Sequence, residues 1–174
     1  DLILNGPYSH GGFRQVNNEM NEILTNLVKE KQNDLFPKAT KILDLFGGSG
    51  NLTKNIPIPS TVIDAHGESL LVEQDGHQHF LKLNLYSRRA PNVIRELIEQ
   101  SIGPLAILDP PRSGLKNIDD FFSDQNNLQG IIYVSCNPAT LFRDLEKLDN
   151  HKIIEVHLID LFPGTFHFET VVVL

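Results

Sequence analysis

Short apolar segments alternate with amphipathic ones along most of the chain, and this alternation limits the possible fold more than any other feature. Apolar runs bounded by turn residues predict strands at residues 41–46, 61–64, 79–83, 105–108, 131–135, 153–159 and 168–174. Apolar residues at helical spacing predict helices at residues 16–31, 91–100 and 138–148. Strands separated by helices form a mostly parallel sheet that helices cover on both faces. We therefore expect an α/β fold with a doubly wound, seven-stranded sheet.

The last two expected strands follow each other without a helical pattern between them. Strands joined in this way pair antiparallel, so we expect the last strand to be antiparallel at one edge of the sheet. Ligands of doubly wound sheets bind in the crevice at the carboxyl ends of the strands. The segments that follow the strands are therefore the first candidates for function.

Composition indicates a folded domain rather than a disordered or membrane-spanning chain. The 174 residues suit one α/β domain, and 40% apolar with 21% charged residues is ordinary globular composition. The sequence has no apolar run of about 18 residues, the length that suggests a transmembrane helix, and its first residues lack the features of a secretory signal. Because the chain does not begin with methionine, we expect a domain of a longer protein.

The single cysteine, Cys136, excludes an internal disulfide and a multi-cysteine metal site within this sequence. Free thiols are typical of reducing compartments, so we expect a cytoplasmic protein. The net charge is −7, from 15 Lys and Arg against 22 Asp and Glu, which argues against a broad basic surface for a polyanion. A nucleic-acid substrate would therefore need a further region to hold it.

The first expected strand is followed by a glycine-rich segment, Phe46-Gly47-Gly48-Ser49-Gly50-Asn51. Glycines in such a turn let a ligand approach the backbone closely. The second expected strand ends at Asp64, whose two carboxylate oxygens suit the hydroxyl pair of a ribose. These features favour a nucleotide-like ligand, although a tight turn and a solvated strand end explain the same residues.

The fourth expected strand is followed by Asp109-Pro110-Pro111-Arg112-Ser113-Gly114. Two prolines fix the backbone just beyond the sheet, so they would present the Asp109 carboxylate rigidly to the crevice. A simple turn of the chain is the alternative. The acid and the arginine beside the prolines favour a ligand site.

Cys136 and Glu169 are the candidates for chemistry. A lone cysteine is more often a small buried residue than a nucleophile. Cys136, however, ends a strand and precedes a helix that begins near Pro138, where the helix dipole favours the thiolate. Glu169 interrupts an apolar strand, which is costly unless the carboxylate is satisfied or used, and His167 could orient it. The alternative for Glu169 is an edge strand whose polar side chain faces water.

Together, these segments resemble the C-terminal catalytic domain of the RNA uracil-C5 methyltransferases, which form 5-methyluridine in transfer RNA or large-subunit ribosomal RNA. Near the amino end, Phe13-Arg14-Gln15-Val16-Asn17 resembles the family's Phe-x-Gln-x-Asn motif. The glycine-rich segment and the Asp109-Pro110-Pro111-Arg112 segment are similar to its cofactor loop and its Asp-Pro-Pro-Arg motif. The most specific matches are the nucleophile motif, Ser135-Cys136-Asn137-Pro138-Ala139-Thr140-Leu141, and the closing motif, from Phe162-Pro163 to His167-x-Glu169.

The resemblance implies a Rossmann-like fold and S-adenosylmethionine as the methyl donor, without a metal in this segment. It makes Cys136 the nucleophile that attacks C6 of uracil and Glu169 the base that removes the C5 proton. It further assigns residues to the cofactor and the reacting base: Gln15, Phe46, Asn51, Asp64 and Asp109, with Asn84 as a candidate contact of the adenine. Residues 1–35 are expected to form an opening loop and an N-terminal helix, and residues 36–174 the catalytic domain.

The resemblance also implies RNA as the partner, either tRNA or rRNA, held mainly by a region that this chain does not contain. One departure is that Pro57 and Pro59 leave room for only about one and a half helical turns where the family has a longer helix. Two alternatives stay open. An RNA cytosine-C5 methyltransferase commonly has a second cysteine beside the proline motif, and none is present here. A cofactor-binding fragment without turnover would fit the negative charge.

Overall fold

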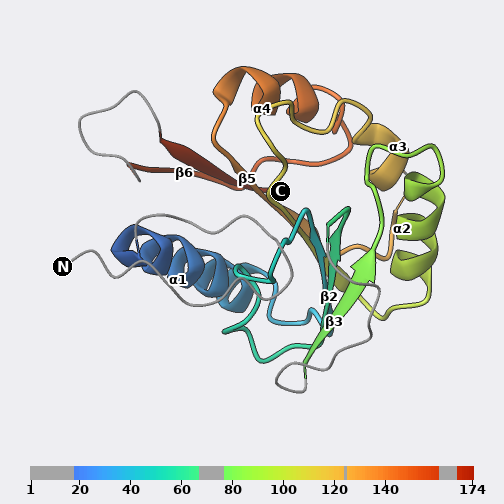
Figure 1. Cartoon of the computed structure of the whole chain (residues 1–174), viewed down its shortest axis with the longest axis horizontal. Helices are drawn as coiled ribbons and strands as arrows, with labels where there is room; N and C mark the ends of the chain where they lie inside the picture. Colours follow the sequence, from blue (N-terminus) through green and yellow to red (C-terminus); the bar gives the residue numbers. More distant parts are fainter. Residues whose placement is uncertain (1–17, 67–76, 124, 161–167) are drawn as a thin grey trace.

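The computed structural model describes residues 18–66, 77–123, 125–160 and 168–174 (Figure 1). Its strands are β1 (Lys41–Leu45), β2 (Ser60–Asp64), β3 (Gln78–Lys82), β4 (Pro104–Leu108), β5 (Gly130–Ser135), β6 (Glu155–Ile159) and β7 (Glu169–Val173). Its helices are α1 (Asn18–Leu35), α2 (Ala90–Glu99), α3 (Asp119–Phe122) and α4 (Pro138–Leu145). The strands form one seven-stranded sheet in the order β3-β2-β1-β4-β5-β7-β6.

The sheet is parallel from β3 through β5, and β7 runs antiparallel to both of its neighbours, β5 and β6. The predicted mostly parallel α/β sheet with an antiparallel last strand is therefore confirmed. The last strand does not form the edge itself, because β7 inserts between β5 and β6. This insertion buries β7 in the sheet and leaves β6 at the edge.

Two apolar cores lie on opposite faces of the sheet, because successive side chains of a strand point to opposite sides. One face packs against α1 through residues that include Ile42, Ile107, Val134 and Val171 of the strands, with Leu24 and Val28 of the helix. The other face packs against α2, α3 and α4 through residues that include Leu43, Leu108, Tyr133 and Val172, with Ile94, Phe121 and Leu141. Figure 1 shows α1 on one side of the sheet and the other helices across from it.

The helices differ from the prediction mainly at their ends. Pro138 begins α4 in the first-turn position, and the Asn137 side chain caps the helix by accepting from the Ala139 N–H at 3.1 Å. Leu148 is buried as the spacing predicts, yet α4 ends at Leu145 and the following turn closes through i to i+3 bonds. The four residues of α3 are too few to give a periodic pattern. Between β1 and β2 the chain forms hydrogen-bonded turns and no helix.

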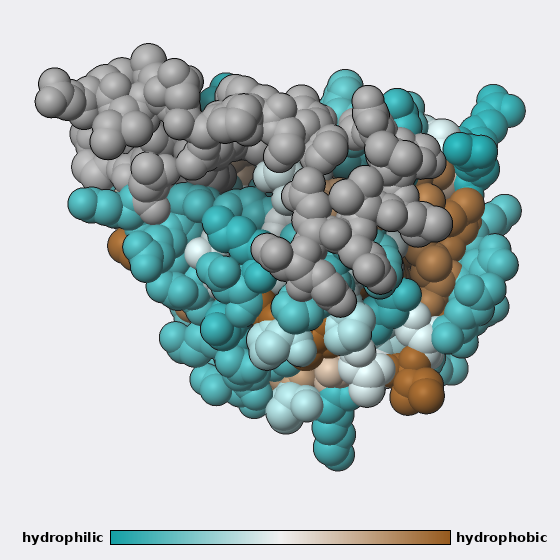
Figure 2. All heavy atoms as spheres, turned by 60° about the horizontal axis from the view of Figure 1, so that its bottom comes forward, coloured by the Kyte–Doolittle hydropathy of each residue, from teal (hydrophilic) through white to brown (hydrophobic). Residues whose placement is uncertain are grey.

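On the face that Figure 2 shows, hydrophilic side chains predominate among the described residues. Within those residues, no helix combines the length and the apolar character that crossing a membrane requires. The expected opening loop at residues 1–17 lies outside the described residues, and the expected N-terminal helix is α1.

Candidate active site at the carboxyl edge of the sheet

The described candidate residues all lie at one edge of the sheet. They follow or end the parallel strands as predicted: Phe46 and Asn51 after β1, Asp64 in β2, Asn84 after β3, Asp109 after β4 and Cys136 after β5. Because β7 is antiparallel, its first residue, Glu169, meets the same edge. Gln15 and His167 lie outside the described residues.

The register of β5 and β7 places Cys136 opposite Glu169. Ser135 pairs with Thr170, so the next step along both strands brings Cys136 and Glu169 together. Opposite residues of an antiparallel pair point to the same face, and alternation gives this pair the face of Val134, which packs against α1. The sulfur and the carboxylate, 33 residues apart in sequence, therefore share one face and one edge of the sheet.

Glu169 is a buried and unusually basic carboxyl group. Its side chain is only 7% exposed, and its Oε2 has no hydrogen-bond partner within the part of the chain that the structure describes. Burial, followed by the nearby charge of Asp109, raises the pKa of Glu169 to about 7, against a smaller lowering by Arg112. The alternative of a water-facing residue on an edge strand is wrong, because β7 is internal and the side chain is buried.

Cys136 is partly buried, and its charge environment is mixed. Burial raises the pKa of the thiol, and the charges of Glu169 and Asp109 raise it further. A hydrogen bond and the positive charge of Arg112 lower it. The net direction favours the protonated thiol in the free protein, opposite to the effect expected from the start of α4, because desolvation and neighbouring acids raise the pKa. Arg112 was not predicted as a site residue, although its place beside the two prolines indicated a ligand site.

Asp109 lies between the residues that follow β1 and β2 and those at the ends of β5 and β7. Its backbone N–H donates to the Leu45 carbonyl at 3.2 Å, which holds the start of the 109–114 loop against β1. Burial raises the pKa of its carboxyl group to about 7. Its charge acts on Asp44 on one side and on Glu169 and Cys136 on the other. Asp109 therefore influences the protonation of groups on both sides of it.

Asp44 is a functional candidate that the sequence analysis missed. Its side chain is fully buried in β1, and the Thr53 hydroxyl donates to its Oδ2 at 2.8 Å. Burial raises its pKa to about 7, Thr53 opposes this shift, and the charges of Asp109 and Asp64 add to it. The signal was present: like Glu169, Asp44 is an acid inside an apolar strand, which is costly unless it is satisfied or used.

The glycine-rich turn after β1 is tightly held. The Gly48 N–H donates to Asp64 Oδ2 at 3.1 Å, and the His66 N–H donates to Asp64 Oδ1 at 2.9 Å. Gly50 has a φ of 75°, and a Cβ there would lie 2.5 Å from Gln78 Nε2. The conformation therefore favours glycine at this position, and a larger side chain would also have to displace the Gln78 amide. Asp64 braces this loop, and any contact with a ribose would add to that role.

The remaining candidates already have protein partners. The side-chain amides of Asn51 and Asn21 donate to each other at 2.7 and 3.1 Å, which joins the glycine-rich turn to α1. Asn84 is exposed, and its Oδ1 accepts from the Tyr86 N–H at 2.9 Å. The ring of Phe46, a residue with a φ of 60°, lies 5.5 Å from the ring of Tyr86. Their roles toward a ligand stay predictions.

The arrangement places a thiol beside a basic carboxyl group, with further acids along the crevice. Asp44, Asp64 and Asp109 make the β1–β4 part of the edge electronegative, which suits a cationic ligand. Among the described residues there is no group of three or more His, Cys, Asp or Glu that could hold a metal ion. The groups present are those of nucleophilic and acid–base catalysis.

The chain is similar to known proteins in sequence and in fold. A family model described as tRNA (Uracil-5-)-methyltransferase matches residues 97–174. The chain is 33% identical to the 23S rRNA (uracil(1939)-C(5))-methyltransferase RlmD of Legionella pneumophila (strain Corby), over 98% of this chain and 40% of that protein. It is also 33% identical to the protein of the same name from Francisella tularensis subsp. novicida (strain U112), over 92% of this chain and 37% of that protein.

Solved structures support the fold. The crystal structure of Pyrococcus abyssi tRNA (uracil-54, C5)-methyltransferase in complex with S-adenosyl-L-homocysteine matches with a TM-score of 0.62 and 24% identity, over 94% of this chain and 40% of that chain. The chain thus spans about 40% of the length of the relatives that it matches.

Proposed function

Because the chain belongs to the RNA uracil-C5 methyltransferase family, we propose that it carries the site that transfers a methyl group from S-adenosylmethionine to C5 of a uridine in RNA. The observation that carries this proposal is the juxtaposition of Cys136 and Glu169 on one face of the sheet. Methylation at C5 of uracil needs a nucleophile for C6 and a base for the C5 proton. These two side chains supply both groups.

Each side chain has one task in the reaction. The Cys136 thiolate attacks C6 and forms an S–C6 bond, which moves the electron pair of the C5–C6 double bond to C5. S-adenosylmethionine, when bound, would supply the methyl group that C5 takes up, with cleavage of its S–CH3 bond and S-adenosylhomocysteine as the leaving group. Glu169 then accepts the C5 proton, the C5–C6 double bond forms again, and the S–C6 bond breaks to return the thiolate. A carboxylate with a pKa of about 7 is a stronger base than an ordinary glutamate.

Arg112 supports the nucleophile. Burial and two carboxylates keep the free thiol protonated, and the Arg112 guanidinium is the one described group whose charge and hydrogen bond both favour the thiolate. Attack on C6 requires the thiolate. We assign Arg112 the role of stabilising the ionised sulfur as the reaction begins.

The acids on the β1–β4 side fit the methyl donor, whose sulfonium and ammonium groups are positive. Asp44 and Asp109 have pKa values raised to about 7, so a cation beside them would favour their ionised forms and be bound by them. The left-handed glycines of the loop, Gly48 and Gly50, let a ligand approach the backbone. Phe46, Asn51, Asp64 and Asn84, and Gln15 from outside the described residues, are the further proposed contacts.

RNA binding requires more than this chain offers. The net charge of −7 cannot supply the cationic contacts that hold phosphates, so we propose that a further region of a longer protein grips the RNA in the cytoplasm. The target uridine must leave its stack to reach the crevice. The relatives with 33% identity are named for 23S rRNA, which favours ribosomal RNA over tRNA as the substrate.

The adduct with 5-fluorouridine RNA tests the proposal in the complete protein. Fluorine replaces the hydrogen that Glu169 would remove, so the methylated adduct cannot break down and survives denaturation. The wild type should form this adduct in the presence of S-adenosylmethionine, and Cys136→Ala should form none. Glu146→Gln, an exposed acid at the end of α4, is the matched control and should behave like the wild type. An adduct in Cys136→Ala would overturn the assignment of the nucleophile.

A further inference from the structure

A buried polar cluster joins α4 to the 109–114 loop, and the proposed chemistry does not use it. At its centre Asp144 is fully buried. Its Oδ2 accepts from the Tyr133 hydroxyl at 2.7 Å and from the Leu115 N–H at 2.6 Å, and its Oδ1 accepts from Arg143 Nε at 2.9 Å. A buried carboxylate is tolerated only when donors satisfy it, so this network fixes one arrangement of β5, α4 and the loop.

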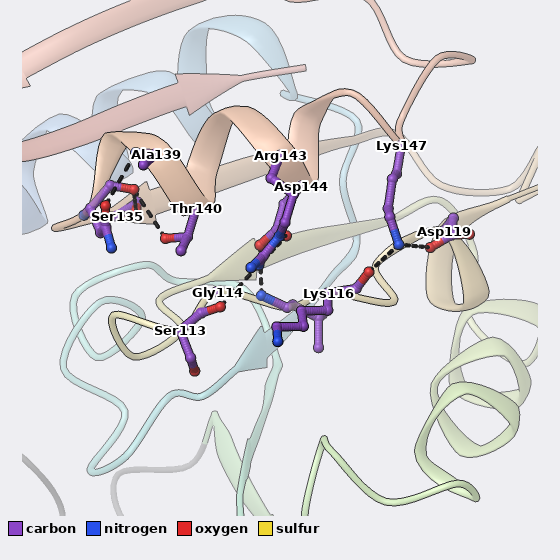
Figure 3. Close-up of polar contacts among 12 residues, drawn as sticks. Ser113, Gly114, Lys116, Asp119, Ser135, Ala139, Thr140, Arg143, Asp144 and Lys147 are labelled. Carbon is purple, nitrogen blue, oxygen red and sulfur yellow. Dashed lines mark hydrogen bonds and ion pairs between the residues drawn. The ribbon is translucent and has the colours of Figure 1, made fainter.

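The same helix holds the carbonyl groups of the loop. Arg143 Nη2 donates to the Ser113 carbonyl at 2.9 Å while it also bonds Asp144 Oδ1 at 2.5 Å. The Arg112 carbonyl accepts from the Thr140 hydroxyl at 3.1 Å and from Asn137 Nδ2 at 3.0 Å. Figure 3 shows Arg143 and Asp144 pointing from α4 toward Ser113 and Gly114. The backbone of Arg112 is therefore tied to the helix that follows Cys136.

Gly114 shows how closely the loop approaches the helix. It is buried and has a φ of 66°, a conformation that favours glycine. A Cβ at this position would lie 2.6 Å from Arg143 Nη2 and 3.1 Å from Thr140 Cβ. The loop thus lies directly on the polar cluster, and a shift of the cluster would move the loop.

We propose that Tyr133, Arg143 and Asp144 are positioning residues that hold the 109–114 loop so that the Arg112 guanidinium reaches the Cys136 sulfur. The proposal rests on the proposed function only in taking Cys136 as the nucleophile. Its geometric basis is that α4 fixes both partners: the Asn137 N–H donates to Ser135 Oγ at 3.2 Å beside the cysteine, and Arg143 and Asp144 hold the loop beside the arginine.

The charges around the thiol decide what a displaced loop would do. In the described residues, the groups that act on Cys136 are Asp109 and Arg112 of the loop and Glu169 of β7. Both acids raise the pKa of the thiol, and Arg112 lowers it. The Asp109 end of the loop is held separately, by its N–H bond to the Leu45 carbonyl at 3.2 Å. If Arg112 moves away, the acids therefore act unopposed and the pKa of Cys136 rises.

Alkylation by iodoacetamide tests the proposal, because Cys136 is the only cysteine of the 174-residue chain. The rate is measured against pH, and its midpoint reports ionisation of the thiol. Arg112→Gln should raise the midpoint by about one pH unit. Tyr133→Phe, which removes one hydroxyl, should raise it by about half a unit or more, which is a roughly threefold or greater loss of rate below the midpoint.

A double variant separates positioning from general loss of structure. In the Arg112→Gln background, Tyr133→Phe should cause no further shift, because the arginine through which it acts is absent. Arg143→Gln changes a partly exposed side chain and gives a second route if Tyr133→Phe does not fold; it should shift the midpoint in the same direction. Lys147→Gln is the matched control, since Lys147 also tethers the α4 segment by bonding the Lys116 carbonyl and lies 3.6 Å from Asp119, but it should leave the midpoint unchanged.

The outcomes are distinct. A midpoint that stays at the wild-type value in Tyr133→Phe and Arg143→Gln, or a shift that is equally large without Arg112, would overturn the positioning role. The assay needs neither RNA nor cofactor. A shifted midpoint in this chain, with no RNA adduct in the complete protein, would therefore reject the proposed function alone. An adduct in the complete protein without the shift in this chain would reject the positioning role alone.

Discussion

The carboxyl groups in the two halves of the ligand edge, β1–β2 and β5–β7, have different surroundings. In the β1–β2 half, Asp64 accepts backbone N–H groups through both oxygens, and Asp44 accepts the Thr53 hydroxyl through Oδ2, while its Oδ1 has no partner among the described residues. In the β5–β7 half, Glu169 Oε2 has no hydrogen-bond partner among the described residues, and the Cys136 thiol faces two carboxylates. The first half thus ties its acids to the glycine-rich segment, whereas the second places its acid beside the thiol. We infer that the first half binds and the second half reacts.

The largest expected effect lies in the reacting half. In the complete protein, Glu169→Gln should still form the methylated adduct with uridine RNA, because Cys136 and the methyl donor are intact. Release should slow by about 10²- to 10⁴-fold, since no base removes the C5 proton. Decay of the adduct on denaturing gels measures this rate, with Glu146→Gln as the control. A release rate within about threefold of the wild type would assign the base to another residue.

The free energy of unfolding should also respond differently to substitutions in the two halves, with a smaller effect than that on adduct release. Thr53 is buried, and Thr53→Val would leave the buried Asp44 carboxyl group without its hydroxyl donor. We expect the free energy of unfolding, measured in urea at pH 8, to fall by about 1–3 kcal/mol. Thr53→Ser keeps the hydroxyl and loses only a methyl group, so its loss should be smaller. An equal loss in both variants would show that packing, not the hydrogen bond, matters here.

Glu169→Gln should show no such loss under the same conditions. The folded pKa of about 7 lies above the ordinary value of 4.5, so the folded protein holds this proton more tightly than the unfolded chain. Stability from this group is therefore complete below about pH 4.5 and falls as the pH rises toward 7. Glutamine removes that dependence, and the variant should match or exceed the wild type at pH 8. A loss as large as that of Thr53→Val would break the contrast between the halves.

Much of this contrast could be predicted from the sequence, because strand ends are marked locally. Apolar runs gave the positions of Asp64, Asp109 and Cys136, and an acid inside an apolar strand marked Glu169. The same rule would have found Asp44. The position of the antiparallel β7 between β5 and β6 brings Glu169 beside Cys136. This position depends on pairing between distant segments, so the sequence has no local signal for it.

The polar cluster and the state of the thiol also depend on tertiary structure. Asp144 follows Arg143 in an amphipathic helix, where an acid usually faces water, and only packing against Tyr133 and Leu115 buries it. The thiolate expected for Cys136 rested on the helix dipole, a local effect. Burial and the carboxylate of Glu169, which comes from another strand, act in the opposite direction.

The last expected effect concerns the charge of the ligand. Asp44 and Asp109 both have pKa values of about 7, so they change from mostly neutral to mostly ionised between about pH 6 and pH 8. S-adenosylmethionine has a positive sulfur, and S-adenosylhomocysteine, which lacks the methyl group, does not. The affinity ratio of the two ligands, measured by calorimetry, should therefore rise by roughly tenfold over this range in favour of the methyl donor. Asp109→Asn should flatten that rise, because one of the ionising groups is gone. A ratio that is constant with pH would place the sulfur away from these acids, and the binding role of this half of the edge would fail.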